Sequence, residues 1–321
     1  MSCTPWSKIS FGQSLIFFLT LKRNKFFVTL TFITFIVCTH LNAQKVFTET
    51  SLFVKSSGGK VYETLDISYA KVSCLTWEIP FYLDFAAEEK ISFYNFLSSF
   101  GINFSIPNNF GSIEDRDFYL SGDICQFSKH ENHLDSSYFA FVNFGCNFLI
   151  NNFKIIPLLG LKYQFRKFSA WNGYVQSPSS GKSWSGNEEK NHFVGNGISY
   201  EQNIVQPFLK TSVNYKIKKN FFIEARLTFS PYIFSVCKDS HYFRNKEFID
   251  KMKGGFSFAL EAGVHYKKTG LYFSYEYLKT STNANTWEYE TGKKKSDATL
   301  IKGYIPGFIS SIWSFGFSYC F

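Results

Sequence analysis

Hydrophobic and polar residues alternate along most of the chain with a period of two residues. The pattern is clearest in segment 307–321, where aromatic residues from Trp313 onward alternate with small or polar ones. Segment 220–236 repeats it with Glu224 and Arg226 on the face opposite the apolar residues. Because successive strand residues point to opposite faces, each such segment is predicted to be a β-strand with one apolar face.

Segments of this kind predict an antiparallel barrel with an even number of strands. Polar and charged residues lie on one face and aromatic residues on the other, so the apolar face must contact lipid. Closure into a barrel avoids unpaired backbone groups in the hydrocarbon. Short connections alternate with long ones, which in bacterial barrels lie outside the cell. We therefore predict an all-β, ten-stranded antiparallel transmembrane β-barrel with long extracellular loops, about 106–134, 171–197, 237–252 and 284–306.

Composition agrees with this architecture. The 321 residues include 40 Phe and 19 Tyr, yet the mean hydropathy is only −0.11. A helical membrane protein would instead carry repeated apolar runs of roughly 20 residues. His265 falls on the predicted inner face near Glu261, Glu224, Glu276 and Arg226, where we expect a polar network rather than a catalytic group. The net charge of +9 gathers mainly at short turns and one loop, so no nucleic-acid partner is expected.

The N-terminus reads as an export signal. A basic cluster at 21–25 precedes the apolar run 26–39, and Ala43 suits cleavage by a signal peptidase. A single N-terminal anchor helix is the weaker alternative. We predict a removed signal peptide over 1–43 and one barrel domain over 44–321, located in the bacterial outer membrane.

Cysteine and histidine spacing indicates no metal or cofactor. Five cysteines would remain after cleavage, an odd number at long spacings, which is no disulfide framework. Cys125 and Cys237 lie in predicted loops that also hold acidic residues, so one bridge between them stays open. His130, His133 and His192 have no fixed metal-ligand spacing.

Two short polar motifs follow predicted strands at the long-loop end of the barrel. Asp115 and Asp117 follow the third strand, and Asp239 and His241 follow the seventh. These strands stand nearly opposite in a ten-stranded ring, and residues i and i+2 share a face, so both pairs can point inward across the mouth. A carboxylate that orients an imidazole forms a general base, and a second acid pair can hold water. Exposed turn-forming acids are the alternative that spacing alone leaves open.

Four blocks of sequence resemble the omptin family of outer-membrane aspartate–histidine proteases. They are "KVSCLTWEIP" (71–80), "GSIEDRDFY" (111–119), "FSKHENHLD" (127–135) and "DSHY" (239–242). The order of segments is similar over essentially the whole mature chain.

The resemblance implies an endopeptidase that hydrolyses polypeptides without a covalent intermediate. Asp239 would orient His241, and His241 would be the general base for a water molecule held with Asp115. Asp117 would complete the acid couple. The alternatives are a catalytically inactive omptin-like barrel that acts as an adhesin or binding surface, and a small porin.

Ser128 and His130 match family positions that would support the site. Two acids that favour basic substrates in the family are replaced, at positions matching Gly59 and Cys237, which predicts a weakened preference for Arg and Lys. Cys237 near His241 also leaves a thiol–histidine alternative.

The resemblance also bears on lipid. Lys167 matches a basic residue with which family members bind lipid A, whereas Asn203 replaces another. The sequence therefore predicts a reduced or absent dependence on lipopolysaccharide.

Overall fold

The described part of the chain is almost entirely β-strand in this computed structural model. It comprises residues 46–321 without 69, 281–282 and 294–296, and Val46–Phe321 form one unit. The predicted signal peptide lies outside the described residues. Among the described residues, no helix is long and apolar enough to cross a membrane.

Sixteen strand segments and one short 3-10 helix make up this region. They are β1 (Val46–Ile67), β2 (Ala70–Phe93), β3 (Phe96–Ser105), β4 (Asn108–Phe118), β5 (Ile124–Cys146), β6 (Phe148–Ile150), β7 (Phe153–Gln176), β8 (Asn191–Lys218), β9 (Phe221–Ser230), β10 (Phe234–His241), η1 (Tyr242–Arg244), β11 (Lys246–Lys253), β12 (Gly255–Tyr266), β13 (Thr269–Thr280), β14 (Ala284–Glu290), β15 (Thr299–Ile301) and β16 (Tyr304–Cys320).

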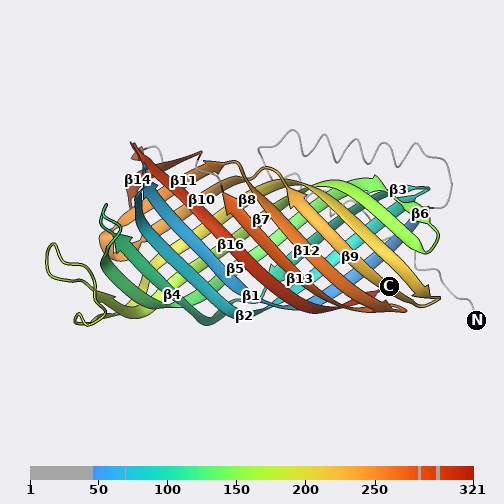
Figure 1. The fold of residues 1–321 in the computed structure, drawn as a ribbon, viewed down its shortest axis with the longest axis horizontal. Helices are drawn as coiled ribbons and strands as arrows, with labels where there is room; N and C mark the ends of the chain where they lie inside the picture. Colours follow the sequence, from blue (N-terminus) through green and yellow to red (C-terminus); the bar gives the residue numbers. More distant parts are fainter. Residues whose placement is uncertain (1–45, 69, 281–282, 294–296) are drawn as a thin grey trace, which may run out of the picture. The chain divides into compact units, whose positions relative to one another are not determined.

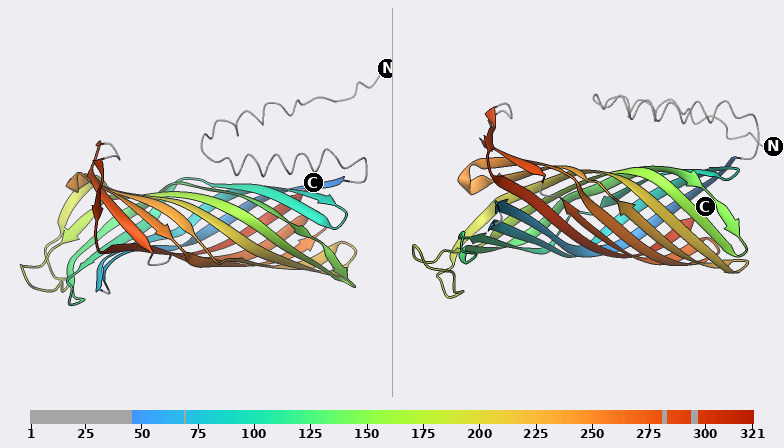
Figure 2. Two further views of the ribbon diagram at one scale, coloured as in Figure 1. Left: turned by 90° about the horizontal axis from the view of Figure 1, so that it is seen from above. Right: turned by 45° about the horizontal axis from the view of Figure 1, so that its top comes forward.

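The segments close into a single antiparallel ring of ten long strands within the described chain. Several long strands consist of two segments, such as β3 with β4 and β9 with β10. Segments β3 and β4 both pair with β2, and β9 pairs with β8 and β12, so each long strand pairs with the strands before and after it in the sequence. Strands β1 and β16 close the ring, from Ser51 opposite Cys320 to Ile67 opposite Tyr304. Figures 1 and 2 show the tilted strands of this elongated barrel. The predicted ten-stranded architecture is confirmed.

The outer wall changes from apolar to charged along the barrel axis. Toward the end with the short turns, outward side chains are apolar and exposed: Leu52, Val54, Phe100, Ile102, Phe104, Leu159, Leu209, Ile223, Leu227, Phe229, Leu260, Val264, Leu271, Phe273, Trp313, Phe315, Phe317 and Tyr319. Toward the other end the wall carries ion pairs, such as Lys60–Glu78 (3.2 Å) and Lys167–Glu201 (2.9 Å). Charged pairs belong in water, so the apolar band spans the bilayer and the charged end rises above it.

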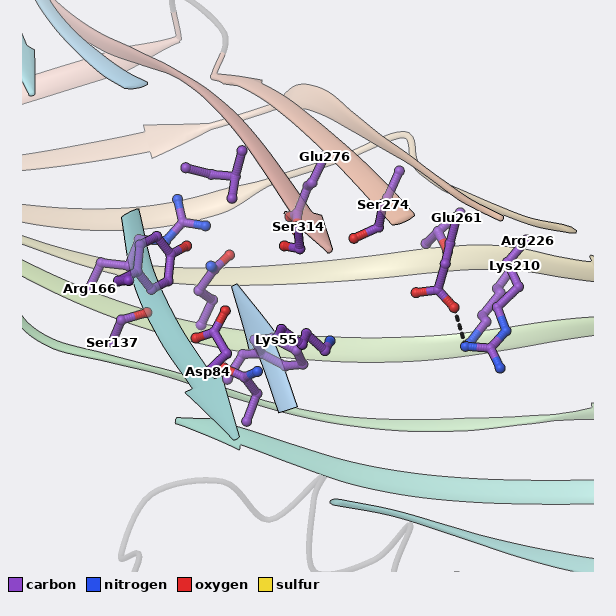
Figure 3. Close-up of a pocket in the computed structure, with 17 residues that line it drawn as sticks. Lys55, Asp84, Ser137, Arg166, Lys210, Arg226, Glu261, Ser274, Glu276 and Ser314 are labelled. Carbon is purple, nitrogen blue, oxygen red and sulfur yellow. Dashed lines mark hydrogen bonds and ion pairs between the residues drawn. The ribbon is translucent and has the colours of Figure 1, made fainter. Parts of the chain in front are cut away.

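The interior of the apolar band holds a polar network. Lys162 Nζ lies 2.8 Å from Glu276, Arg226 pairs with Glu224 and Glu261, and His265 lies 3.3 Å from Glu224. A cavity of about 150 Å³ lies beside this network, with Arg226, Glu261 and Glu276 on its wall (Figure 3). His265 and its neighbours thus belong to the predicted polar network of the barrel interior.

An apolar cluster fills the lumen above this network. Trp77 is fully buried, and its ring stacks on Phe168 at 5.6 Å and on Tyr200 at 6.0 Å between centroids. Val61 and Phe308 add fully buried side chains from β1 and β16. The cluster forms a floor beneath the charged end of the barrel, which we call the mouth.

The predicted boundaries of the long loops were wrong. Segment 106–134 contains β4 and the start of β5, and segment 237–252 contains most of β10 and β11. The hydrophobic alternation fades there because the outward faces above the membrane are polar, as at Glu114 and Lys238. The strands therefore extend well past the length that a bilayer requires.

Candidate active site

The four predicted catalytic residues lie on two strands at the mouth of the barrel. Asp115 and Asp117 are on β4, and Asp239 and His241 end β10. Figure 1 shows both strands at the same end, opposite the C-terminus. Asp115 and Asp239 face inward and are buried, at 7% and 6% exposure. Both pairs are thus fixed by strand pairing rather than carried on loops.

Asp239 and His241 form a hydrogen-bonded dyad. Nε2 of His241 lies 2.6 Å from Oδ2 of Asp239, and the imidazole packs edge-on against Phe248. In this orientation Nε2 donates to the carboxylate and Nδ1 is left as the basic nitrogen. Burial disfavours the charged imidazolium, but the Asp239 carboxylate outweighs burial and raises the pKa of His241 above its ordinary value.

Asp115 is strongly affected by its surroundings. Burial raises its pKa from 3.8 to about 7, and the charge of Asp117 adds to the rise. The positive charges of His241 and Arg244 oppose it, and the charge of Asp239 reinforces it. The two pairs are therefore within electrostatic reach of each other across the mouth. Asp115 Oδ1 and Asp239 Oδ1 are both buried and have no hydrogen-bond partner among the described residues.

Ser128 and His130 lie beside the acid couple on β5. Ser128 is paired with Asp115 in the register of β4 and β5. Its Oγ lies 2.7 Å from Nε2 of His130, and Nδ1 of His130 lies 3.0 Å from the carbonyl oxygen of Asn172. The carbonyl can only accept, so Nδ1 donates to it and the serine hydroxyl donates to Nε2. Burial lowers the pKa of His130, which favours this neutral form.

Cys237 is buried on β10, two residues before Asp239. Burial raises the pKa of its thiol well above the ordinary value. A thiol held neutral is a poor nucleophile, which argues against the thiol–histidine alternative. Cys125 and Cys237 are both free, so the bridge that the sequence left open does not form.

Gly59 and Lys167 lie in the barrel wall, on β1 and β7. A Cβ at Gly59 would be 2.0 Å from the carbonyl oxygen of Ser311, so the position has no room for a side chain. Lys167 is on the outer wall, where its ammonium group pairs with Glu201 at 2.9 Å. Asn203 accepts a hydrogen bond from Tyr163 at 2.8 Å.

Sequence reasoning missed two buried acids near the dyad, Glu63 and Asp250. Asp250 lies opposite Cys237 and accepts a hydrogen bond from Thr286 at 2.7 Å. Burial raises its pKa to about 7. Burial, followed by the charge of Asp239, raises the pKa of Glu63. The indole Nε1 of Trp77 donates a hydrogen bond to Oε2 of Glu63 at 3.4 Å.

A signal for Asp250 was present in the sequence. Residues 246–253 alternate so that Phe248, Asp250 and Met252 share a face, although the segment up to residue 252 is predicted above to be a loop. A third residue that the sequence analysis missed, Arg244, pairs with Asp117 at 3.8 Å. Among the described residues, no group of three or more His, Cys, Asp or Glu could hold a metal ion.

The arrangement can carry out hydrolysis. A histidine base backed by a carboxylate lies across the mouth from a second carboxyl couple, above an apolar floor. Such groups can hold a water molecule, remove its proton and return the proton to a leaving group.

The fold is similar to that of a solved outer-membrane protease, and two further chains match with low TM-scores. The crystal structure of outer membrane protease OmpT from Escherichia coli is similar, with a TM-score of 0.73, 16% identity, and coverage of 87% of this chain and 99% of that chain. The transport unit of autotransporter AIDA-I from Escherichia coli has a TM-score of 0.35 and 10% identity, covering 87% of this chain and 92% of that chain. The translocator domain of NalP from Neisseria meningitidis has a TM-score of 0.31 and 10% identity, covering 88% and 92%.

No curated protein matches the sequence. The sequence profile of the Omptin family matches residues 43–321, which includes the whole chain outside the predicted signal peptide. The resemblance noted in the sequence is therefore confirmed. This chain, an outer-membrane β-barrel with a protease-type fold, belongs to the omptin family.

Proposed function

We propose that this barrel is a cell-surface endopeptidase that cleaves polypeptides with a water molecule activated at its mouth. The observation that carries the proposal is that Asp115 and Asp239 are both buried at the mouth and that the β10–β11 hairpin reaches the β4 couple, where Arg244 Nη2 lies 3.8 Å from Asp117 Oδ2. Two catalytic half-sites on opposite sides of one ring have no structural need to meet. Their convergence over an apolar floor supports a common substrate position.

The proposed reaction uses each residue in one role. Asp115, with Asp117, holds the attacking water, and Nδ1 of His241 removes its proton as the oxygen bonds to the scissile carbonyl carbon. Asp239 stabilises the imidazolium that results. The tetrahedral intermediate then collapses, the carbon–nitrogen bond breaks, and the imidazolium returns its proton to the leaving amine.

Ser128 and His130 are proposed to position the acid couple rather than to attack the substrate. The Ser128 hydroxyl is directed to His130, so its own proton is engaged. Ser128 is the neighbour of Asp115 in the sheet. The Ser128–His130 hydrogen bond can therefore hold in place the part of the wall that carries Asp115 and Asp117.

The interior argues against transport as the main function. Trp77, Phe168 and Phe308 are fully buried side chains from three parts of the ring, and they pack together across the lumen. We therefore expect no ion conductance from the barrel in planar bilayers.

The test is cleavage of an unbiased peptide library by the purified, refolded barrel. We expect wild type to cleave and both Asp115→Ala and His241→Ala to lose about 10²–10⁴-fold in rate, the usual contribution of general acid–base groups. Asp123→Ala is the matched control, because Asp123 is an exposed carboxylate in the turn between β4 and β5. Absence of cleavage by wild type would favour an inactive binding barrel. Full activity in both variants would reject the mechanism.

A further inference from the structure

The tip of the β10–β11 hairpin carries an arginine over the mouth. Beyond His241 the chain makes the single turn η1, Tyr242–Arg244, and Asn245 closes the tip in the left-handed conformation with φ 53°. Strand β11 then returns from Lys246. Arg244 is thus placed three residues after the proposed base by a tight turn rather than by a long loop.

The tip is braced on two sides. The Phe243 ring packs edge-on against Phe193 of β8 at 5.0 Å between centroids. On the other side, the Asn245 carbonyl accepts a hydrogen bond from the backbone N–H of Thr291 at 3.2 Å. The backbone at Arg244 is therefore anchored to both neighbouring parts of the rim, while its side chain is free to extend inward.

The Arg244 side chain crosses the mouth. Its Nη2 lies 3.8 Å from Oδ2 of Asp117, which is on β4, and the side chain is 56% exposed. Burial and the neighbouring carboxylates dominate the pKa values of Asp115 and His241, and the charge of Arg244 lowers both. One guanidinium group therefore lies within reach of both halves of the proposed site.

The charge balance of the site leaves a role for this cation. Asp115, Asp117 and Asp239 supply carboxyl groups, and a tetrahedral intermediate adds a negative charge on the former carbonyl oxygen. The imidazolium formed at His241 is already paired with Asp239. Without a further cation, the new negative charge would therefore lie unopposed beside the Asp115–Asp117 couple, and like charges repel. The contact with Asp117 is long for an ion pair, so the guanidinium can move to a new acceptor with little loss.

We propose that Arg244 is a further catalytic residue that binds the oxyanion of the tetrahedral intermediate. This role rests on the proposed function. As the water oxygen bonds to the carbonyl carbon, the π electron pair moves to the carbonyl oxygen, and the guanidinium N–H groups donate to that oxygen. When the carbon–nitrogen bond breaks, the pair returns, the carbonyl re-forms and Arg244 goes back to Asp117.

The hairpin itself offers a matched control. Lys246 is one residue past the tip, is also about half exposed, and forms an ion pair with Glu288 on β14. Lys246→Ala removes the same charge from the same hairpin. Its charge is not among the main influences on Asp115 or His241.

The experiment compares steady-state cleavage of one library-derived peptide by wild type, Arg244→Ala, Arg244→Lys and Lys246→Ala. A lost oxyanion donor typically costs about 10²–10³-fold in kcat, and we expect about 10–10²-fold for Arg244→Ala because this group is more than half exposed. KM should change little. Arg244→Lys should recover part of the loss, and Lys246→Ala should resemble wild type.

A second readout separates oxyanion binding from a structural role. A phosphinate peptide, in which a tetrahedral phosphorus group replaces the cleaved bond, should inhibit Arg244→Ala more weakly by the same factor as the loss in kcat/KM. Equal losses in Arg244→Ala and Lys246→Ala, or unchanged phosphinate inhibition, would overturn the role of Arg244 while leaving the peptidase proposal intact. Failure of wild type to cleave any peptide would overturn both.

Discussion

Replacement of Asp115 by Asn should make the barrel more stable at alkaline pH while abolishing cleavage. In the folded protein, burial next to Asp117 raises the pKa of Asp115 from 3.8 to about 7. The folded state therefore binds this proton more tightly than the unfolded state does. Stability from this group is fully present below pH 3.8 and is lost as the pH rises through about 7.

The magnitude follows from the size of this rise. Moving the pKa of a carboxyl from 3.8 to about 7 corresponds to about 4 kcal/mol at most, since one pKa unit is about 1.4 kcal/mol. In the variant His241 and Arg244 lose the negative charge of Asp115 that they face in wild type, so we expect a net gain in unfolding free energy of about 1–3 kcal/mol. Asparagine has nearly the same shape and carries no charge to desolvate.

Urea unfolding of the refolded barrel, followed by tryptophan fluorescence at pH 4 and pH 8.5, measures this effect. Asp115→Asn should exceed wild type in unfolding free energy at pH 8.5 and approach it at pH 4. Asp123→Asn, in the exposed turn, should stay within about 0.5 kcal/mol of wild type at both. An Asp115→Asn variant that is less stable than wild type at pH 8.5 would refute the reasoning.

Three further predictions concern the floor, the base and the substrate preference. Trp77→Ala should lower the unfolding free energy by about 3–5 kcal/mol, because the fully buried ring stacks on two other aromatic rings. Urea unfolding at constant pH measures this loss, and a loss below about 1 kcal/mol would contradict tight packing. Cleavage should fall with decreasing pH through a midpoint above the ordinary histidine value of 6.5, since only neutral His241 accepts the proton. In Asp239→Asn the residual pH–rate profile should shift to lower pH, because burial and the charge of Arg244 then lower the pKa of His241 with only Asp115 opposing them. A midpoint that stays in place would exclude His241 as the base. Burial keeps Asp250 neutral below about pH 7. The preference for Lys or Arg next to the cleaved bond should therefore increase between pH 6 and pH 8.5 in wild type and not in Asp250→Asn. Library profiles that are equally pH-dependent in both proteins would remove Asp250 from the substrate site.

The sequence predicted best where lipid constrains the wall. The alternation around Trp313 fixed the strand, its outward face and the closure of the ring, because hydrocarbon excludes polar side chains and unpaired backbone. Above the membrane the outward face contacts water, so residues 237–241 lack hydrophobic contrast and their pattern predicts a loop, although they belong to β10.

The site was predictable in its residues and less so in its environment. The i, i+2 spacing predicts that Asp239 and His241 lie on one face of extended chain, and both do lie on β10. This prediction needs only an extended backbone and not the exact bounds of the strand. The pairing of Arg244 with Asp117 joins residues on opposite sides of the ring, and such contacts follow from barrel closure rather than local pattern.

Whether the two sides of the mouth act on one water molecule can be measured by a double-mutant cycle. The rate of cleavage would be compared in wild type, Asp115→Ala, His241→Ala and the double variant. If the two residues serve a single chemical step, each single variant should lose nearly as much activity as the double. Losses that multiply, as for two independent sites, would contradict a shared catalytic centre across the barrel.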